Sequence, residues 1–201
     1  MDTKNKKMKV WELSLLIALC VSLCTGAWAQ SKQEKISSGL IRLHVIAVSD
    51  SDTEQEIKLC VRDSVLDYLS PRLEAVSDSE SAQEIIRSEL EGIKLAAENA
   101  SCGRSVRVSL SEEYYPTRIY DGFSLPAGRY ESLRVILGEG EGHNWWCVVF
   151  PPLCVSAAEQ EKALDAMSDD VRGIVGNDEG HVIRFRIVEL WNELCEALGF
   201  S

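Results

Sequence analysis

The residues best suited to nucleophilic chemistry are a cysteine, a histidine and an aspartate that lie far apart in the chain. Cys147, His143 and Asp50 would supply the thiol, the base and the orienting group of a thiol hydrolase. Cys147, however, stands inside an apolar run, where a thiol is more often inert than reactive. The other histidines, His44 and His181, are isolated, and none of the three has metal-ligand spacing. The residues therefore favour a protein that is not an enzyme, with an exported thiol hydrolase as one alternative.

A glycine-rich run, G-E-G-E-G over residues 138–142, is the second place to look for a ligand. It does not fit a phosphate loop, because it lacks the lysine and its two carboxylates would repel a phosphate. Calcium bound by Glu139 and Glu141 is conceivable, but the EF-hand pattern of ligands is absent, so a solvated turn fits better. No cofactor or metal is expected.

The stretch that follows this run is the densest in residues that are costly to place. Trp145 and Trp146 stand side by side, and an apolar run continues to Phe150, as in a buried strand. Pro151 and Pro152 then end the strand, because neither can donate to a ladder. Cys147 and Cys154 bracket this corner, and we expect them to lie close together and to form a disulfide.

The first 29 residues have the features of an export signal. A lysine-rich start precedes an apolar stretch over residues 13–23, which is short for a transmembrane helix, and Ala27-Trp28-Ala29 fits an A-x-A cleavage site. We therefore expect residues 1–29 to be removed and the mature domain to comprise residues 30–201, without stable membrane insertion. An uncleaved anchor is the alternative.

The mature chain is expected to be strongly acidic and to hold an odd number of cysteines. Removing the four lysines and two acids of residues 1–29 leaves 17 Lys and Arg against 30 Asp and Glu, a net charge of −13. Such a chain will not bind nucleic acid or anionic lipid through a generic basic surface. Five cysteines remain, an odd number, so at least one is free or pairs with another chain.

The first half of the chain predicts a strand followed by two helices. Residues 40–47 alternate between apolar and polar side chains, as a strand does. Ser51 and Glu54 form a capping box for a helix that runs to about Leu69, where Pro71 is expected to stop it.

The second predicted helix covers residues 78–99 and begins at a capping box formed by Ser77 and Glu80. A half-exposed strand follows over residues 106–111. Residues 114–128 read as an irregular arm with turns and room for one short strand pair.

The second half of the chain adds the rest of a sheet. A strand over residues 129–137 is expected to pair antiparallel with residues 145–150 across the glycine-rich loop. The last predicted elements are a helix over 156–167, a strand over 182–188 and a helix over 189–198. The order β-α-α-β-β-β-α-β-α predicts a single α+β domain, with a mostly antiparallel sheet covered by helices.

Adjacent residues of a strand point to opposite faces, so Trp145 and Trp146 are expected to differ in role. We expect one to anchor the core, and the other to form a contact patch with the aromatic arm that holds Tyr115, Pro116 and Tyr120. The alternative is that both are structural.

Five blocks resemble the stage II sporulation protein R family of endospore-forming bacteria. They are L-I-R-L-H-V-I-A-V-S-D at 40–50, K-L-C-V-R-D at 58–63, Tyr115-Pro116-Thr117 with Tyr120, P-A-G-R-Y-E-S-L-R-V at 126–135, and G-E-G-H-N-W-W-C-V-V-F-P-P-L-C at 140–154. The departures are Val48, where the family typically has Asn, and Cys60, at a usually polar position.

This resemblance implies a secreted signal for sporulation rather than an enzyme. Members of the family are exported into the space between the forespore and mother-cell membranes, where they activate a membrane-embedded aspartic-type protease that processes pro-sigma-E. A cell-wall-binding module is a further alternative. The blocks supply no catalytic residues, only residues expected to contact the partner: His44, Asp50, Arg62, Asp63, Tyr115, Pro116, Tyr120, Asn144, Trp145 and Trp146.

Overall fold

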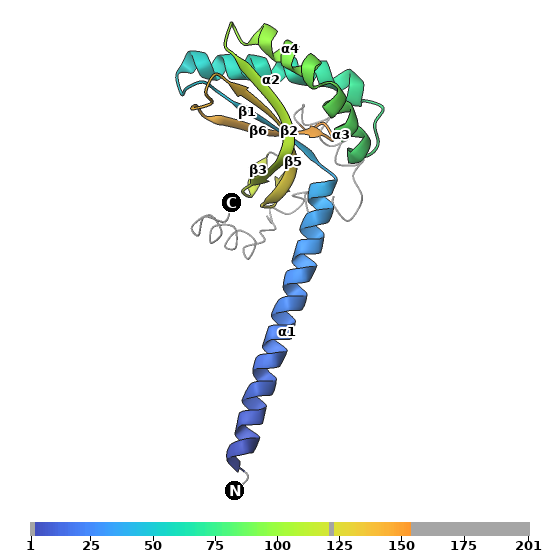
Figure 1. Ribbon diagram of the computed structural model, residues 1–201, viewed down its shortest axis with the longest axis vertical. Helices are drawn as coiled ribbons and strands as arrows, with labels where there is room; N and C mark the ends of the chain where they lie inside the picture. The colour runs from blue at the N-terminus through green and yellow to red at the C-terminus, as the bar shows by residue number, and fades with distance from the viewer. Residues whose placement is uncertain (1–2, 121–122, 154–201) are drawn as a thin grey trace.

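A computed structural model of the protein describes residues 3–120 and 123–153. Its first element, α1 (Thr3–Ser38), runs away from a domain in which a four-stranded sheet is covered on one face by helices (Figure 1). The remaining elements, in chain order, are β1 (Ile41–Ile46), α2 (Asp52–Leu73), α3 (Ser79–Ser88), α4 (Leu90–Ala100), β2 (Val106–Tyr115), β3 (Arg118–Tyr120), β4 (Phe123–Leu125), β5 (Gly128–Leu137) and β6 (Asn144–Phe150). The predicted α+β class is confirmed. The helix, strand and helix expected after residue 155 lie outside the described residues.

The sheet has the strand order β2-β5-β1-β6. β1 is parallel to β5, whereas the β1–β6 and β2–β5 pairings are antiparallel. The expected direct pairing of β5 with β6 is therefore wrong, because β1 lies between them. Every residue of β1 is buried, as is typical of a central strand that pairs with a neighbour on each side. The loop over residues 138–143 only has to step across about 10 Å, two strand spacings.

The helices differ from the sequence prediction in two places. Pro71 was expected to stop the first long helix, yet α2 continues to Leu73, which is buried one turn after Leu69. The expected single helix over 78–99 is divided into α3 and α4 at Glu89, whose carboxylate accepts a hydrogen bond from the Tyr68 hydroxyl. The N-cap of α3 is Asp78 rather than Ser77, and its side chain accepts from Ser81 N at 2.8 Å. The Ser51 cap of α2 is confirmed.

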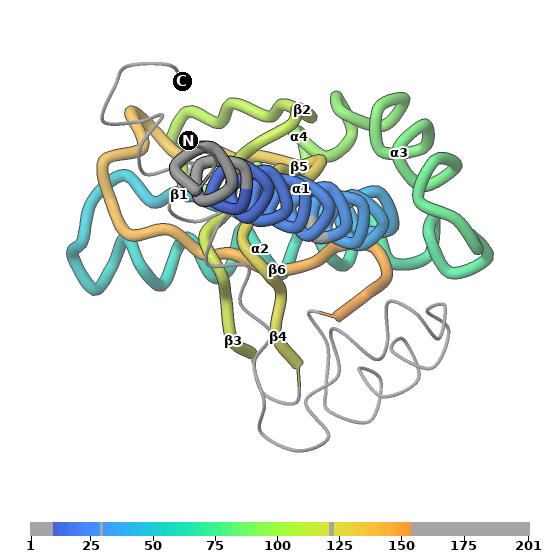
Figure 2. Tube along the Cα trace, turned by 90° about the horizontal axis from the view of Figure 1, so that it is seen from below, coloured from blue at the N-terminus to red at the C-terminus, as the bar shows by residue number. Residues whose placement is uncertain are grey.

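Two separate cores lie on the two faces of the sheet. The larger core joins the odd-numbered residues of β1 to the apolar stripes of α2, α3 and α4, and contains Leu43, Val61, Ile86 and Leu133. The smaller core lies under the β3–β4 pair and the end of α1, and contains Ile36, Tyr115, Phe123 and Tyr130. Figure 2, seen along α1, shows β3 and β4 projecting together from the sheet. The short strand pair expected in the arm is thus confirmed.

Candidate functional site

The face of the sheet under the β3–β4 pair holds a buried arginine. Arg42 is fully enclosed, and its guanidinium carbon lies 4.0 Å from the Tyr115 ring centroid, 5.2 Å from that of Tyr130 and 5.8 Å from that of Tyr120. One guanidinium nitrogen donates to the Tyr120 hydroxyl, while Nε and Nη1 have no hydrogen-bond partner. Burial raises the pKa of Tyr115 and of Tyr130, so both rings stay neutral π-faces for this cation.

A second polar network, next to Arg42, centres on Glu113. Its carboxylate lies 3.0 Å from His44 Nδ1, accepts from Ser132 Oγ at 3.0 Å and lies 3.5 Å from Arg134 Nε. Ser132 Oγ is in turn 2.6 Å from the Tyr115 hydroxyl. The serine and the histidine thus both contact the carboxylate rather than each other, which is not the order that a nucleophile, its base and an orienting acid require.

The Glu113 network predicts a pH-dependent stability. Burial alone would raise the pKa of Glu113, but His44, Ser132 and Arg134 together hold it below its ordinary value of 4.5. A depressed folded-state pKa contributes stability above the unfolded pKa, and this contribution is lost as the pH falls through the folded value. Urea unfolding between pH 7 and pH 3 should therefore show a weaker pH dependence for Glu113→Gln than for the wild type. The control is Glu112→Gln, on an exposed neighbour, which should keep the wild-type profile.

The two tryptophans lie on opposite faces of β6. Trp145 is opposite Val45 on the helix side, is 36% exposed, and lies under the Arg62 guanidinium at 4.5 Å. Trp146 is half-buried on the other side, with Arg118 over its ring at 3.7 Å and the His44 ring centroid at 5.6 Å. The Tyr120 hydroxyl donates to the Trp146 carbonyl at 3.4 Å. The arm therefore lies with the more buried tryptophan, so the expectation that it flanks the exposed one is corrected.

The glycine-rich loop is fastened to the turn between β1 and α2. Gly142 N donates to Ala47 O at 2.9 Å, and His143 donates its backbone N–H to Asp50 Oδ1 at 2.6 Å. Lys58, a buried residue of α2, donates from Nζ to His143 O at 3.1 Å. Burial lowers the pKa of Lys58, Asp50 opposes this effect, and Arg62 adds to it. His143 and Asp50 do meet, as a thiol hydrolase would need, but Cys147 is disulfide-bonded and offers no free thiol.

Gly142 gives a prediction about this loop. A Cβ on Gly142 would lie 2.4 Å from Ser49 O and 2.6 Å from Ser49 C, and backbone atoms cannot swing away as a side chain can. We expect Gly142→Ala to lower the free energy of unfolding by roughly 1–3 kcal/mol, the range of a local backbone displacement. Gly39→Ala is the matched control, because its Cβ would meet only ordinary contacts at 3.6 and 3.7 Å. Equal stability of the two variants in chemical unfolding would contradict the prediction.

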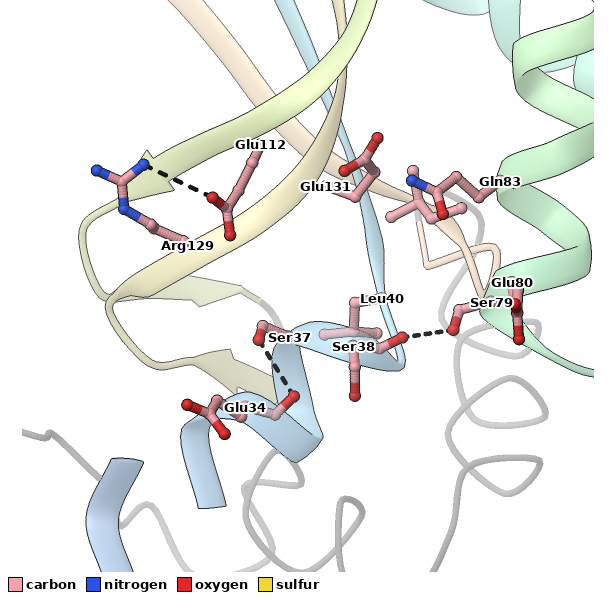
Figure 3. Close-up of a pocket in the computed structure, with 11 residues that line it drawn as sticks. Glu34, Ser37, Ser38, Leu40, Ser79, Glu80, Gln83, Glu112, Arg129 and Glu131 are labelled. Carbon is pink, nitrogen blue, oxygen red and sulfur yellow. Dashed lines mark hydrogen bonds and ion pairs between the residues drawn. The ribbon is translucent and has the colours of Figure 1, made fainter. Parts of the chain in front are cut away.

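A cavity of about 570 Å³ opens where α1 reaches the sheet. Its lining, drawn in Figure 3, includes four carboxylates, those of Glu34, Glu80, Glu112 and Glu131, and Arg129, which pairs with Glu112 at 3.7 Å. The hydroxyls of Ser37, Ser38 and Ser79 all donate to backbone carbonyls, so none is paired with a base. Within the described residues, no group of three or more His, Cys, Asp or Glu side chains is placed to hold a metal.

The structure divides the residues expected to contact a partner into two groups. His44, Tyr115, Tyr120 and Trp146 meet around Arg42 on one face of the sheet. Asn144 and Trp145 begin β6, Arg62 and Asp63 lie on α2, and Asp50 lies in the turn between β1 and α2. Pro116 is exposed between β2 and β3. The expected Cys147–Cys154 disulfide stays a prediction, because Cys154 lies outside the described residues.

Sequence reasoning missed Arg42, Arg118, Glu113 and Ser132. Arg42 belongs to the polar half of the alternation over residues 40–47, which ordinarily faces solvent, and only the aromatic density of residues 114–130 indicates a cover.

Fold and site together define an α+β domain with arginine–aromatic contacts on its sheet and, among the described side chains, no serine or cysteine hydrogen-bonded to a histidine. The family model for stage II sporulation protein R matches residues 37–160. Stage II sporulation protein R of Bacillus subtilis (strain 168) is 35% identical over 162 residues, which cover 77% of this chain and 72% of that protein. The chain belongs to the stage II sporulation protein R family, which assigns it a role in sporulation. No solved structure matches the chain.

Proposed function

We propose that the chain is an exported signalling protein that activates, by contact, a membrane-embedded aspartic-type protease of the mother cell. The activated protease would process pro-sigma-E, and the site of action would be the space between the forespore and mother-cell membranes. The observation that carries this proposal is membership of the sporulation family, joined to an N-terminal helix of export type. The disulfide at Cys147 argues against the thiol hydrolase alternative.

The N-terminal helix supports the export step. Over Val10–Ser38 α1 is long and apolar enough to cross a membrane, and its most apolar window has no buried residue, a property that signal sequences share. The C-terminal end of α1, in contrast, packs against the domain. Ile36 is fully buried, and the Gln33 side chain lies so close to Gly128 that a Cβ there would collide with it. Cleavage after Ala29 would therefore remove the exposed part and leave the part that packs against the domain.

This cleavage is a testable prediction. Mass spectrometry of the exported form should find Gln30, or its cyclised form, at the N-terminus. A full-length product that stays in the membrane fraction would contradict it and favour an uncleaved anchor.

Reconstitution in a host that does not sporulate tests the function itself. The protease and pro-sigma-E are produced together, with and without the full-length chain, and cleavage of pro-sigma-E is followed by immunoblot. We expect cleavage only when the chain is present and exported, and none when residues 2–29 are deleted so that it stays in the cytoplasm. Cleavage that does not depend on the chain would refute the proposal. Sedimentation of the exported chain with purified cell wall would favour a wall-binding module instead.

A further inference from the structure

β6 is an edge strand of the sheet. Its described partner is β1, and none of the described strands lies on its other side. The beginning of the strand is open to solvent, with Asn144 and Trp145 exposed and Trp146 half-buried. The family model matches residues 37–160, so β6 lies near the end of the matched part of the chain.

The two edges of this sheet differ in how well they are protected against pairing with another strand. β2, at the opposite edge, carries Arg107, Glu112 and Glu113 and packs against α4. β6 has the sequence N-W-W-C-V-V-F, without a charged residue or proline. Edge strands normally carry charges, prolines or bulges that prevent another strand from adding to them. β6 has no charge or proline, and its register shift against β1 falls between Val148 and Phe150, beyond residues 144–146. The beginning of this edge is therefore suited to receiving a further strand.

An arginine is stacked on each tryptophan of this edge. Arg62, from α2, lies over Trp145 on one face of the sheet, and Arg118, from β3, lies over Trp146 on the other. The side chains of a strand added to β6 would alternate between the same two faces, so neighbouring side chains would reach the two guanidinium groups. The chain is acidic as a whole, yet this edge is flanked by cations.

Arg118 is the guanidinium with an open place for an anion. Arg62 already contacts Asp63 at 2.6 Å, whereas Arg118 has no carboxylate partner among residues 3–120 and 123–153. Its Nε is buried without a hydrogen-bond partner, and Nε and Nη1 of the nearby, fully enclosed Arg42 are also unsatisfied. Two neighbouring cations without an anion are costly in a partly desolvated site, and a carboxylate supplied from outside would offset that cost.

We propose that the outer edge of β6 from Asn144 to Trp146 receives an extended segment of the partner protease as an added strand, with an acidic side chain of that segment bound to Arg118. Main-chain hydrogen bonds would hold the segment, and the acidic side chain on the Trp146 face would fix its register. This proposal rests on the proposed function and names the surface through which it would act.

Charge reversal at Arg118 tests the proposal in the reconstituted system with the full chain. Arg118→Glu should raise the concentration of the chain needed for half-maximal cleavage of pro-sigma-E at least tenfold, because a carboxylate would then oppose a carboxylate. Arg107→Glu, the matched reversal on the β2 edge, should change it less than twofold, because Arg107 is a surface charge with one ion pair at 4.0 Å. Thermal unfolding of each variant shows whether it folds, and Arg118→Gln, with a smaller expected loss, replaces Arg118→Glu if the latter does not fold.

Peptide binding and hydrogen exchange give two independent readouts. Overlapping synthetic peptides from the extracytoplasmic part of the protease are titrated against tryptophan fluorescence. The peptide that binds should do so less tightly when its acidic residues are changed to lysine, and this loss should be reversed in Arg118→Glu. The same peptide should slow exchange of the amides of residues 144–146.

The outcomes separate the two proposals. If the wild-type chain activates no cleavage, the proposed function fails. If it does and a folded Arg118→Glu variant is equally active, only the edge proposal is overturned. Amides of residues 144–146 that are already as protected as those of β1 in the free chain would also overturn it, because residues 161–201 or a second copy would then occupy the edge.

Discussion

Trp145→Ala is expected to fold normally and to lose protease activation, whereas Trp146→Ala is expected to lose stability. Trp145 lies at an exposed edge with only Arg62 stacked on it, so truncation exposes little core. Trp146 packs against the smaller core, His44 and Arg118, and truncation of a large aromatic in such a place costs about 3–5 kcal/mol. A central aromatic anchor of an interface is worth roughly 2 kcal/mol or more, which corresponds to at least a tenfold loss of activation for Trp145→Ala.

The measurements are thermal unfolding and pro-sigma-E cleavage for both variants. Trp11→Ala provides the matched control, because Trp11 is 78% exposed and belongs to the segment expected to be removed. It should leave both the stability of the mature domain and its activity unchanged. If Trp145→Ala is as active as the wild type, the exposed tryptophan does not contact the partner.

Local sequence signals predicted most of the elements but not their neighbours in the sheet. The alternation of residues 40–47 located β1, and the Ser51 cap located the start of α2. The insertion of β1 between β5 and β6 depends on pairings between distant residues, 90 positions apart for Leu43 with Leu133 and 104 for Leu43 with Cys147. Alternation specifies which residues share a face and does not specify which strand lies beside it.

Two helix boundaries were missed because tertiary contacts override local preferences. Pro71 lacks an N–H for the helix ladder, but burial of Leu73 on the stripe of Leu69 holds the last turn of α2 in place. The break between α3 and α4 depends on Glu89, whose carboxylate meets Tyr68, and on Gly92, which leaves room for the Tyr68 hydroxyl. Neither contact can be inferred from the spacing of apolar residues along the helix.

The candidate site was predicted in its aromatic residues and missed in its cations. We expected Tyr115 and Tyr120 to lie near one of the two tryptophans, and the structure places Trp146 beside them, packed against the smaller core. In an alternating strand the polar half, which here includes Arg42, is usually assigned to the solvent side. The β3–β4 pair reverses that assignment, because it covers the face and turns a surface position into the most enclosed charge of the described domain.

Arg42→Ala is expected to destabilise the domain by about 3 kcal/mol, whereas Arg42→Met should cost less than about 1 kcal/mol. Alanine leaves a cavity between the rings of Tyr115, Tyr120 and Tyr130, and truncation of a large buried side chain carries a cost of that size. Methionine fills most of this volume and makes favourable contacts with aromatic rings. It also removes a buried cation whose Nε and Nη1 have no hydrogen-bond partner, so the desolvation penalty disappears together with the cation–π attraction.

Chemical unfolding of the two variants separates the volume of Arg42 from its charge. A methionine variant as unstable as the alanine variant would mean that the cation–π contacts and the hydrogen bond to Tyr120 dominate. Arg129→Ala and Arg129→Met are the matched controls, since the Arg129 side chain is 60% exposed on the adjacent strand and should tolerate both changes within about 0.5 kcal/mol. Near-wild-type stability of Arg42→Met would leave the charge of Arg42 without a structural purpose. The role of the charge would then be its effect on Arg118. Burial lowers the pKa of Arg118 most, and the positive charge of Arg42 lowers it further.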